Sequence, residues 1–467
     1  MSLAKARNVL ILGGGASGTL LAIQILRTNT NTTITLIERT ASPGKGIAYG
    51  SVDPIHLLNV RASNMSAYPD MPDHFVHWLD KNSQDARAIG GENFRFASRL
   101  AFGNYLSSEL QRLSATAQRC TNIQGEAVAL SRSASGIVVT LDNYRRVKGD
   151  VAVIATGYEA PTISGLPGDL IPWLSVDGAS LKKVESILLL GTGLSTVDQV
   201  QSLIAAGYQG KIYAISRRGL LPHAHRPVEP AAIADADVPY GRRLSKIFHW
   251  FRTRSEQAAK TGSDWRAVLD GLRPYVQKIW QSLSLEDKAR FVRHARPWWD
   301  VRRHRMAPKV AAAIDDLIAR GRLIIIPAKI ISVTPQDNEN GSFKVFFRRR
   351  GTHAVEAIEV EGITDCTGFS VDVSRIKNPL IRSLLDQGLA RPDRLGLGFD
   401  VDGAAALIDL RGDAASDIFA LGPLTRGAFW EITGIPDIRE QCAQLAARLT
   451  DPLDTRAVDQ GTRARSG

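Results

Sequence analysis

A glycine-rich turn near the N-terminus is the feature that most constrains the fold of this 467-residue chain. Residues 8–12 (NVLIL) are typical of a short buried strand and lead directly into a G-x-G-x-x-G turn. Its glycines, Gly13, Gly15 and Gly18, permit a tight turn, close approach of a pyrophosphate and close helix–strand packing. A helix and a second strand follow, and Glu38 ends that strand, where an acid can accept hydrogen bonds from a ribose. This unit predicts a dinucleotide-binding site with the pyrophosphate at the helix N-terminus.

A second strand–turn–helix–strand unit begins at residue 186. Its turn, GTGLST, contains Gly191 and Gly193 but has Thr196 at the third glycine position, which predicts looser helix–strand packing. Its second strand ends in Arg217 and Arg218 instead of an acid, and cations there can hold the 2′-phosphate of NADP. We therefore expect a second nucleotide site that prefers NADPH to NADH. The alternative is an arginine pair that merely faces solvent.

Two dinucleotide sites in one chain imply electron transfer between a tightly held flavin and a diffusible hydride donor. We therefore expect an α/β protein with two Rossmann-like dinucleotide-binding domains, the second inserted in the first, and a basic helical elaboration. Two predicted strands end in Thr-Gly, one at Thr156-Gly157 and one near residue 368. This repeat supports an arrangement in which the chain returns to the first domain after the second. The expected boundaries are 1–165 and 356–450 for the FAD-binding domain, 166–355 for the NAD(P)-binding domain with a helical insertion at about 241–320, and 451–467 for a polar tail.

The formal net charge of +11 is concentrated in one segment of the chain. Residues 241–310 contain 17 Lys and Arg and 6 Asp and Glu, so 17 − 6 = +11, which equals the whole excess. Such a segment could bind a small anion, nucleic acid or a membrane surface, or it could be a solvated helical face. Because no RRM, helix-turn-helix or zinc pattern is present, nucleic acid is the disfavoured partner. No run of 18 apolar residues that could span a membrane is present either.

Cysteine is scarce, and Cys120, Cys366 and Cys442 are isolated from one another in the sequence. No C-x-x-C or C-x4-C pair is present, so the redox-active cysteine pair of disulfide reductases is missing. Neither a Cys-rich zinc site nor an HExxH motif is present, so we expect no metal. Scarce cysteine suits the cytoplasm, and the glycine turn interrupts the apolar run at 9–26, which argues against a signal peptide.

Several longer stretches are specific to one family of proteins. They are GKGIAYG (44–50), LLNVRASNMSAYPDMPDHFVHWL (57–79), FASRLAFGNYL (96–106), RHARPWWDVRRHRMAP (293–308) and ALGPLTRGAFWEITGIPDIREQ (420–441). With them, the chain resembles bacterial FAD/NAD(P)-binding proteins related to the flavin-containing and N-hydroxylating monooxygenases, over about residues 8–448. Few of these proteins have an assigned substrate, so the resemblance implies fold and cofactor more firmly than reaction.

The resemblance also implies which residues contact FAD and NADPH. In the related proteins a backbone amide at the position of Val128 pairs with adenine. The turn at Gly434-Ile435-Pro436, together with Gly422, would place a helix N-terminus by the flavin pyrimidine ring, where a positive helix end stabilises the anionic reduced flavin. The expected cofactor-binding residues are Gly13, Gly15, Gly18, Glu38, Val128, Thr156, Gly157, Gly191, Gly193, Ser195, Arg217, Arg218, Gly422, Gly434 and Ile435.

A reaction follows from the same resemblance. NADPH would reduce FAD by hydride transfer, O2 would add at the flavin C4a, and the C4a-peroxyflavin would hydroxylate a nitrogen or sulfur of a small polar substrate. Two other hypotheses remain open: a flavin NAD(P)H reductase or dehydrogenase with another acceptor, and a non-catalytic nucleotide- or nucleic-acid-binding protein. A peroxyflavin that persists after reduction and exposure to air would separate the first two, and NADPH consumption would exclude the third.

One candidate catalytic residue is an asparagine in the segment LNVRASNMSAYPD (58–70). It resembles the segment of flavin-containing monooxygenases whose asparagine contacts the flavin peroxide and the nicotinamide. Asn59 matches that asparagine. Because one extra residue precedes Asp70, Asn64 is the alternative match. A third interpretation is that Asn59 only caps a turn.

Residues 293–308 supply further candidates, because they place Arg296, His304 and Arg305 beside two adjacent tryptophans. Planar guanidinium groups and indole rings could bind and stack an anionic substrate close to the flavin. In the structural alternative, these cations pair with acids and the tryptophans belong to the core. We take Arg296 and His304, together with the two asparagines, as the candidate catalytic residues.

Overall fold

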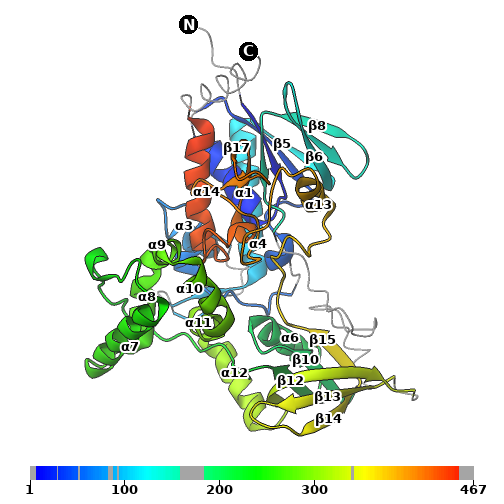
Figure 1. Cartoon of the computed structure of the whole chain (residues 1–467), viewed down its shortest axis with the longest axis vertical. Coiled ribbons are helices and arrows are strands. Elements are labelled where there is room, and N and C mark those ends of the chain that lie inside the picture. Colours follow the sequence, from blue (N-terminus) through cyan, green and yellow to red (C-terminus); the bar gives the residue numbers. More distant parts are fainter. Residues whose placement is uncertain are drawn as a thin grey trace.

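Two six-stranded sheets with helices packed against them form the framework of the molecule. The computed structural model describes residues 7–28, 30–50, 53–82, 88–91, 94–157, 184–337 and 341–451. The first sheet lies in the upper part of Figure 1, the second lies at the lower right, and a group of helices lies at the lower left.

The first sheet has the strand order β16-β17-β9-β1-β2-β5. Its strands are β1 (Asn8–Leu12), β2 (Thr33–Glu38), β5 (Cys120–Gln124), β9 (Val151–Ile154), β16 (Ala406–Ile408) and β17 (Ala414–Ala420). Within this sheet all pairings are parallel except that of the edge strand β16 with β17. Helix α1 (Ala16–Arg27) packs against α4 (Arg99–Ala117) and α14 (Ile435–Thr450). The central strands are continuous Val, Ile and Leu runs because helices and loops bury both of their faces.

The second sheet has the order β14-β13-β12-β11-β10-β15. Its strands are β10 (Ser186–Leu190), β11 (Lys211–Ser216), β12 (Leu323–Pro335), β13 (Phe343–Arg349), β14 (Val355–Val360) and β15 (Gly362–Asp365). The strands from β15 to β12 are parallel, whereas β12, β13 and β14 form an antiparallel meander. Helices α6 (Leu194–Ala205) and α12 (Pro308–Ala319) contribute apolar side chains to its core.

The two halves of the molecule repeat one order of elements. Each begins with a strand, a glycine turn, a helix and a parallel strand, and each later adds a third parallel strand, an antiparallel meander and a returning strand. In the first half the meander is a separate sheet of β6 (Ala127–Ser133), β7 (Gly136–Leu141) and β8 (Arg146–Gly149). Because β16, β17 and α14 return to the first sheet after the second is complete, the predicted fold class is confirmed.

One predicted domain boundary is wrong. We expected residues from 356 onward to belong to the first domain, but β14 and β15 lie in the second sheet, and β15 pairs with β10. The error has a physical cause: a buried strand that ends in Thr-Gly is needed beside the glycine turn of both sheets, so the motif alone does not tell which sheet it joins. The chain therefore returns to the first domain only after Asp365. The predicted boundary at 165/166 and most of the 451–467 tail lie outside the described residues.

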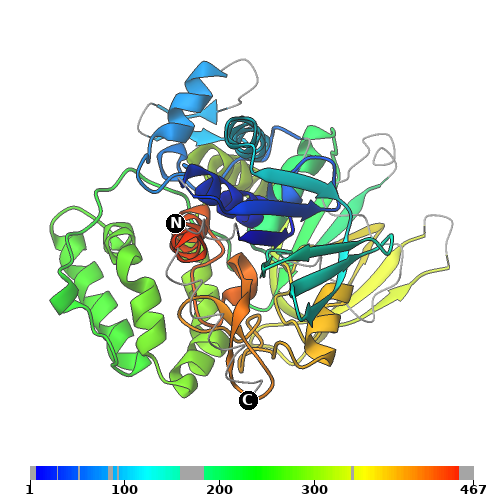
Figure 2. The same ribbon diagram turned by 90° about the horizontal axis from the view of Figure 1, so that it is seen from above.

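The basic insertion is helical, as predicted. Its helices are α7 (Leu244–Lys260), α8 (Trp265–Leu272), η3 (Arg273–Tyr275), α9 (Val276–Ser282), α10 (Leu285–Arg290), the π-helix η4 (Phe291–Ala295) and α11 (Arg296–Arg303). Figure 2 shows them grouped on one side of the molecule. Their core includes Trp280 and Phe291 and is completed by Leu397 and Trp430 from the last segment of the first domain. The insertion is therefore packed onto the first domain, although it leaves the second.

The segment between β2 and β5 contains α2 (Gly46–Tyr49), η1 (Ala62–Asn64), α3 (His74–Lys81), β3 (Ala88–Ile89), β4 (Phe96–Ala97) and α4. The remaining short elements are η2 (Asp235–Asp237), α13 (Pro379–Asp386) and η5 (Gly422–Thr425). Among the described residues, no helix combines the length and the apolar character that a membrane span requires.

Candidate functional site

The first glycine turn has the shape that a pyrophosphate requires. Gly13 has a φ of +108°, and a Cβ atom there would lie 2.5 Å from the carbonyl oxygen of Ala155, so only glycine fits. Gly15 is the N-cap of α1 and provides no capping side chain, which leaves the first N–H groups of the helix available to an anion. Thr156 and Gly157 follow Ala155 at the end of β9, directly beside this turn.

Glu38 lies over the same turn at the end of β2. One oxygen of its carboxylate accepts a hydrogen bond from the Gly14 amide at 2.7 Å, and the other accepts from the amide and hydroxyl of Thr40 at 3.0 Å. This carboxylate is half-buried and fixed beside the turn, so it can meet the ribose of a nucleotide whose pyrophosphate lies at α1.

Two other expected FAD contacts are Val128 and Gly422. The register of the β6–β7 pairing shifts between Ala127 and Ala129. Val128 therefore has no partner residue in β7, as in a β-bulge. Gly422 has a φ of +66° and is packed so closely on α1 that a Cβ atom would lie 2.5 Å from the Ser17 hydroxyl. The uncapped start of α1 and the Glu38 carboxylate fit the pyrophosphate and ribose of a dinucleotide such as FAD, whereas the roles of Val128 and Gly422 stay predictions.

The second glycine turn is built in the same way. Gly191 has a φ of +114°, and Gly193 caps α6 without a side-chain hydrogen bond; Ser195 lies in the first turn of that helix. The Thr192 hydroxyl lies 2.9 Å from the Ser216 hydroxyl, which joins the glycine turn to the end of β11. The structure therefore holds the residues that follow Ser216 next to the phosphate-binding turn.

Arg217 and Arg218 are the residues held at this place. Arg217 is exposed and Arg218 is half-buried. Neither guanidinium forms an ion pair with a residue in the part of the chain that the structure describes. Two unpaired cations beside a nucleotide turn provide the charge that a 2′-phosphate requires.

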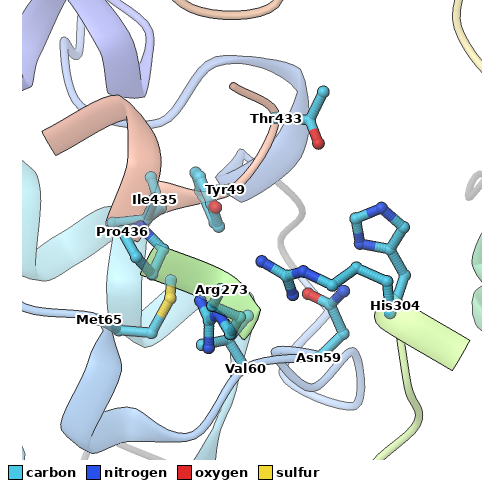
Figure 3. Close-up of a pocket in the computed structure, with 11 residues that line it drawn as sticks. Tyr49, Asn59, Val60, Met65, Arg273, His304, Thr433, Ile435 and Pro436 are labelled. Atoms are coloured by element: carbon cyan, nitrogen blue, oxygen red, sulfur yellow. The ribbon is translucent and has the colours of Figure 1, made fainter. Parts of the chain in front are cut away.

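A pocket lies where three parts of the chain meet. Its wall is formed by the first domain, by the start of α14 and by the helical insertion (Figure 3). The lining residues are Tyr49, Asn59, Val60, Met65, Arg273, Arg303, His304, Thr433, Gly434, Ile435 and Pro436. Gly434 is the N-cap of α14 and adds no capping side chain. Pro436 has no N–H and the Asp437 N–H donates to the Gly434 carbonyl, so the Ile435 N–H is the donor of the first turn that has no intrahelical partner.

Charged groups at one end of the pocket are mostly paired. Arg303 is buried with its Nε 2.8 Å from Glu431, and the same carboxylate accepts a hydrogen bond of 2.8 Å from the Trp299 indole. Burial would raise the pKa of Glu431, but the Arg303 guanidinium and His304 hold it below its ordinary value. Asp437 lies 3.8 Å from Arg303, and burial raises its pKa to about 6.

His304 is a titratable group of this wall that is uncharged near pH 7. It is half-buried at the C-terminal end of α11, where its backbone N–H donates to the Asp300 carbonyl at 2.8 Å. Burial lowers the pKa of the His304 imidazole, and Arg303 beside it acts in the same direction. The imidazole is therefore neutral near pH 7 and can accept a proton.

The structure brings together only some of the candidate catalytic residues. Asn59 and His304 both line the pocket, whereas Asn64, at the end of η1, does not, although its neighbour Met65 does. Arg296 is not brought to this pocket: its Nε lies 3.2 Å from Asp300 on the same helix.

Arg305 does not line the pocket either. It is buried in an ion pair with Asp270, so for both arginines the structural alternative of pairing with acids describes the geometry. Arg273 lines the pocket but was not predicted, because in the sequence it is one arginine among many in the basic segment.

The comparisons with known proteins agree with this geometry. Residues 10–159 match a protein family described as FAD-NAD(P)-binding. This segment is an FAD-NAD(P)-binding domain. A comparison of the sequence with curated proteins finds no match.

Solved structures similar to the whole chain include both monooxygenases and a reductase. The ornithine N-hydroxylase of Kutzneria sp. 744 is 15% identical, with a TM-score of 0.66 over 95% of this chain and 99% of that chain. The cadaverine monooxygenase of Erwinia amylovora is 12% identical, with a TM-score of 0.66 over 96% and 95%. Thioredoxin reductase of Lactococcus lactis is 14% identical, with a TM-score of 0.52 over 95% and 99%. At these identities the likeness shows a shared fold, of which the FAD-NAD(P)-binding domain is one part.

Contacts with the second domain fix the position of Asn59. Its carbonyl oxygen lies 2.9 Å from Nε2 of His225, which follows β11 and packs with its ring centroid 5.2 Å from that of Phe96. Burial lowers the pKa of His225 to about 4, so the ring is neutral and its Nε2–H donates to Asn59. Close by, the ring of His56 is 2.8 Å from the Ser202 hydroxyl of α6. The pocket wall is thus attached to the second domain.

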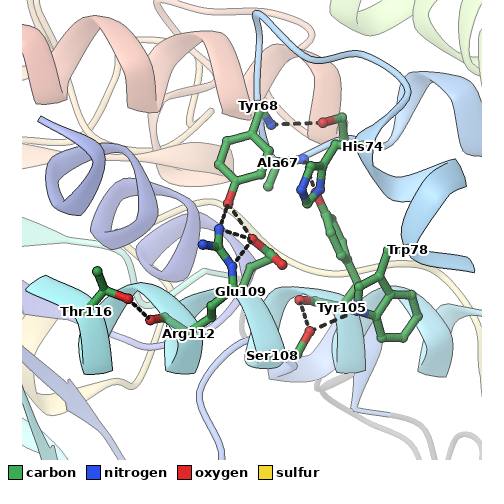
Figure 4. Close-up of polar contacts among 10 residues, drawn as sticks. Ala67, Tyr68, His74, Trp78, Tyr105, Ser108, Glu109, Arg112 and Thr116 are labelled. Atoms are coloured by element: carbon green, nitrogen blue, oxygen red, sulfur yellow. Dashed lines mark hydrogen bonds and ion pairs between the residues drawn. The ribbon is translucent and has the colours of Figure 1, made fainter. Parts of the chain in front are cut away.

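A buried polar network supports the segment that follows Met65 (Figure 4). The Tyr68 hydroxyl donates to Glu109 at 2.5 Å, and Arg112 pairs with the same carboxylate at 2.7 Å. The Tyr105 hydroxyl accepts from the Ala67 amide at 3.1 Å and lies 2.9 Å from Nδ1 of His74. Through these contacts α4 holds residues 65–74 of the FAD-NAD(P)-binding domain in place.

Proposed function

We propose that this protein is an FAD-dependent, NADPH-consuming monooxygenase that hydroxylates a nitrogen or sulfur atom of a small polar substrate, which we expect to be anionic. The observation that carries the proposal is the pocket itself. It combines Asn59, a neutral His304 and the uncapped start of α14 at a place enclosed by apolar side chains such as Met65 and Ile435. Such an enclosed, mostly neutral site suits a reaction that must exclude water.

The cysteines argue against a disulfide reductase, although a thioredoxin reductase has a similar fold. Cys120, Cys366 and Cys442 are all free in the structure, and the last two are buried. Burial raises the pKa of the Cys366 and Cys442 thiols, so neither is a ready nucleophile. A reaction at O2 needs no such thiol pair, whereas disulfide reduction does.

Each part of the chain would have a separate task. Bound FAD would accept a hydride from NADPH and then activate O2. The N-terminus of α1 would bind the pyrophosphate, and Glu38 would bind the ribose. The positive N-terminal end of α14, with the Ile435 N–H, would stabilise negative charge on the reduced ring. His304 would accept the proton that a substrate amine must lose, because its imidazole is neutral at pH 7.

NADPH would be bound by the second domain, with its 2′-phosphate at Arg217 and Arg218. The ornithine N-hydroxylase that is similar in fold was solved with reduced FAD, NADP+ and L-ornithine, which supports a site for both nucleotides. We also propose a cytoplasmic location, because scarce and unpaired cysteine suits a reducing compartment.

The proposal is tested on the FAD-loaded protein with a panel of small amines and thioethers. NADPH should reduce the flavin without oxygen, and in air one member of the panel should yield a product with one oxygen atom from 18O2. We expect Asn59→Ala to retain FAD but to lose at least tenfold in product formation, whereas Asn64→Ala, the matched control, should not.

Two results would contradict the proposal. Reduction by NADPH followed only by H2O2 release, with every panel member, would indicate a reductase or oxidase. A loaded protein that NADPH does not reduce would indicate a non-catalytic binding protein.

A further inference from the structure

Arg273 is a pocket residue that the proposed chemistry does not use. It lies between α8 and α9 of the helical insertion, at the start of η3, and lines the pocket. It comes from a different element than His304, and Figure 3 shows the two side chains at different parts of the pocket wall. Arg273 thus places a cation at a defined end of the pocket.

The other arginines near this end already have acidic partners. Arg303 pairs with Glu431, and Arg305 pairs with Asp270. Asp437, the third carboxylate nearby, lies 3.8 Å from Arg303. Within the described part of the chain, the side chain of Arg273 forms no ion pair and no hydrogen bond, although its backbone N–H donates to the Asp270 carbonyl.

An arginine without a direct partner is costly at this position. Burial lowers the pKa of Arg273 to about 10, and repulsion from Arg303 adds to this effect, whereas attraction by Asp437 and Asp270 opposes it. The group stays charged near pH 7 but has lost part of its hydration. An anionic ligand that enters the pocket would replace that hydration with paired hydrogen bonds.

We propose that Arg273 binds a carboxylate group of the substrate and so determines that this enzyme selects carboxylate-bearing molecules. The guanidinium is planar and donates in parallel to both oxygens of a carboxylate. The remaining wall offers the neutral side chains of Asn59 and His304, apolar groups such as Met65, and Arg303, whose charge is already paired. A substrate held by its carboxylate at Arg273 would therefore place its other end beside Asn59 and His304. The inference rests on the proposed function only in taking this pocket as the substrate side of the flavin.

The test measures binding of a simple carboxylate and so does not depend on turnover. Propionate is titrated into the FAD-loaded protein, and binding is followed by the broadening of its proton resonances in NMR spectra. Inorganic phosphate is titrated in parallel as a competitor. The variants are Arg273→Met, Arg273→Lys and, as a matched control, Arg252→Met, which removes an exposed arginine on α7 of the same insertion.

We expect saturable binding of propionate by the wild type and by Arg252→Met, and a roughly 10–150-fold loss in Arg273→Met, as for removal of a charge-assisted hydrogen bond. Arg273→Lys should retain part of the affinity because it keeps the charge but not the planar donor pair. FAD content and the flavin absorption spectrum should be the same in all four proteins.

Three results would overturn the inference: no saturable binding of propionate by the wild type, equal binding by Arg273→Met, or binding of phosphate alone. Loss of FAD or a changed flavin spectrum in both Arg273 variants would show that this residue serves the cofactor instead.

The two proposals fail separately. A wild type that hydroxylates an amine but ignores propionate refutes only the carboxylate site. Propionate binding at Arg273 in a protein that NADPH cannot reduce refutes only the monooxygenase.

Discussion

At the scale of single residues, the two nucleotide turns differ most at the end of the strand that follows them. In the first turn, the Glu38 carboxylate accepts a hydrogen bond from the Gly14 N–H and is thereby fixed beside the glycines. In the second, the hydroxyls of Thr192 and Ser216 form the corresponding link, and Arg217 follows. A carboxylate accepts hydrogen bonds from ribose hydroxyls and repels a 2′-phosphate. A guanidinium attracts that phosphate. Two similar backbones can therefore select different nucleotides through one position.

This difference predicts the nucleotide preference. Replacing both arginines, as Arg217→Ala/Arg218→Ala, should weaken NADPH binding by roughly 10–150-fold, since a charge-assisted hydrogen bond contributes about 1.5–3 kcal/mol. NADH binding should change little. The measurement is the rate of flavin reduction against nucleotide concentration for both donors. Arg242→Ala/Arg243→Ala, at two exposed positions before α7, is the matched control. An unchanged preference in the first double variant would show that the 2′-phosphate lies elsewhere.

A second prediction at this scale concerns Asp437, whose pKa burial raises to about 6. Because the folded protein then holds this proton more tightly than the unfolded chain, the carboxyl favours folding below about pH 4, and that contribution is lost as the pH rises through 6. The loss is at most about 3 kcal/mol, at 1.36 kcal/mol for each pKa unit. In Asp437→Asn the group is neutral at every pH, so the free energy of unfolding should depend less on pH between 4 and 6.

Urea unfolding at several pH values measures this difference. Asp73→Asn, at an exposed carboxyl before α3, is the control and should follow the wild type. A pH profile of Asp437→Asn that is parallel to that of the wild type would mean that Asp437 is ionised in the folded protein throughout this range.

Single residues also mark the limit of what the sequence could predict. The glycines and Glu38 were predictable because a nucleotide turn requires them at fixed spacing. The choice between Asn59 and Asn64 was open in the sequence, and only the three-dimensional pocket distinguishes them. Arg273 carried no local signal at all. Its place in the pocket depends on how the insertion packs against α14, which no spacing along the chain encodes.

At the scale of elements, the regular strands and helices of both nucleotide units were predicted, but α4 was not, although it has 19 residues. Its buried face includes Phe102, Leu106 and Leu110, but also Glu109, which accepts hydrogen bonds from Tyr68 and Arg112. A charged residue on the core face interrupts the apolar period by which an amphipathic helix is recognised. The helix could not be predicted from its sequence because the partners that satisfy the Glu109 carboxylate are known only from the folded structure.

Elements of the first domain also complete the core of the second. Leu57 and Phe96 belong to the same apolar cluster as Ile187 of β10. Arg99, at the start of α4, pairs at 2.7 Å with the buried Asp198 of α6. These contacts lie on both sides of the Asn59 segment, so the pocket wall moves only if the two domains move together.

At the scale of the whole molecule, the helical insertion connects the two domains a second time. It leaves the second domain before α7 and re-enters it at α12, but its own core is closed by Leu397 and Trp430 of the first domain. Trp280 stacks on Trp430 with ring centroids 4.7 Å apart, and its indole donates to the Gly427 carbonyl at 2.8 Å. This contact holds Arg273 and His304 against α14, so the pocket exists only in the assembled molecule.

The last prediction follows from that contact. Trp280 is 2% exposed, whereas Trp298, on the same insertion, is 42% exposed. Trp280→Ala leaves a cavity between the insertion and the first domain and should reduce the free energy of unfolding by about 3–5 kcal/mol, whereas Trp298→Ala should cost less than about 1 kcal/mol. Hydrogen exchange should also increase in α9, α10 and residues 427–430 of Trp280→Ala, while the glycine turns stay protected. Equal stability and equal exchange in the two variants would mean that the insertion is held in place by other contacts.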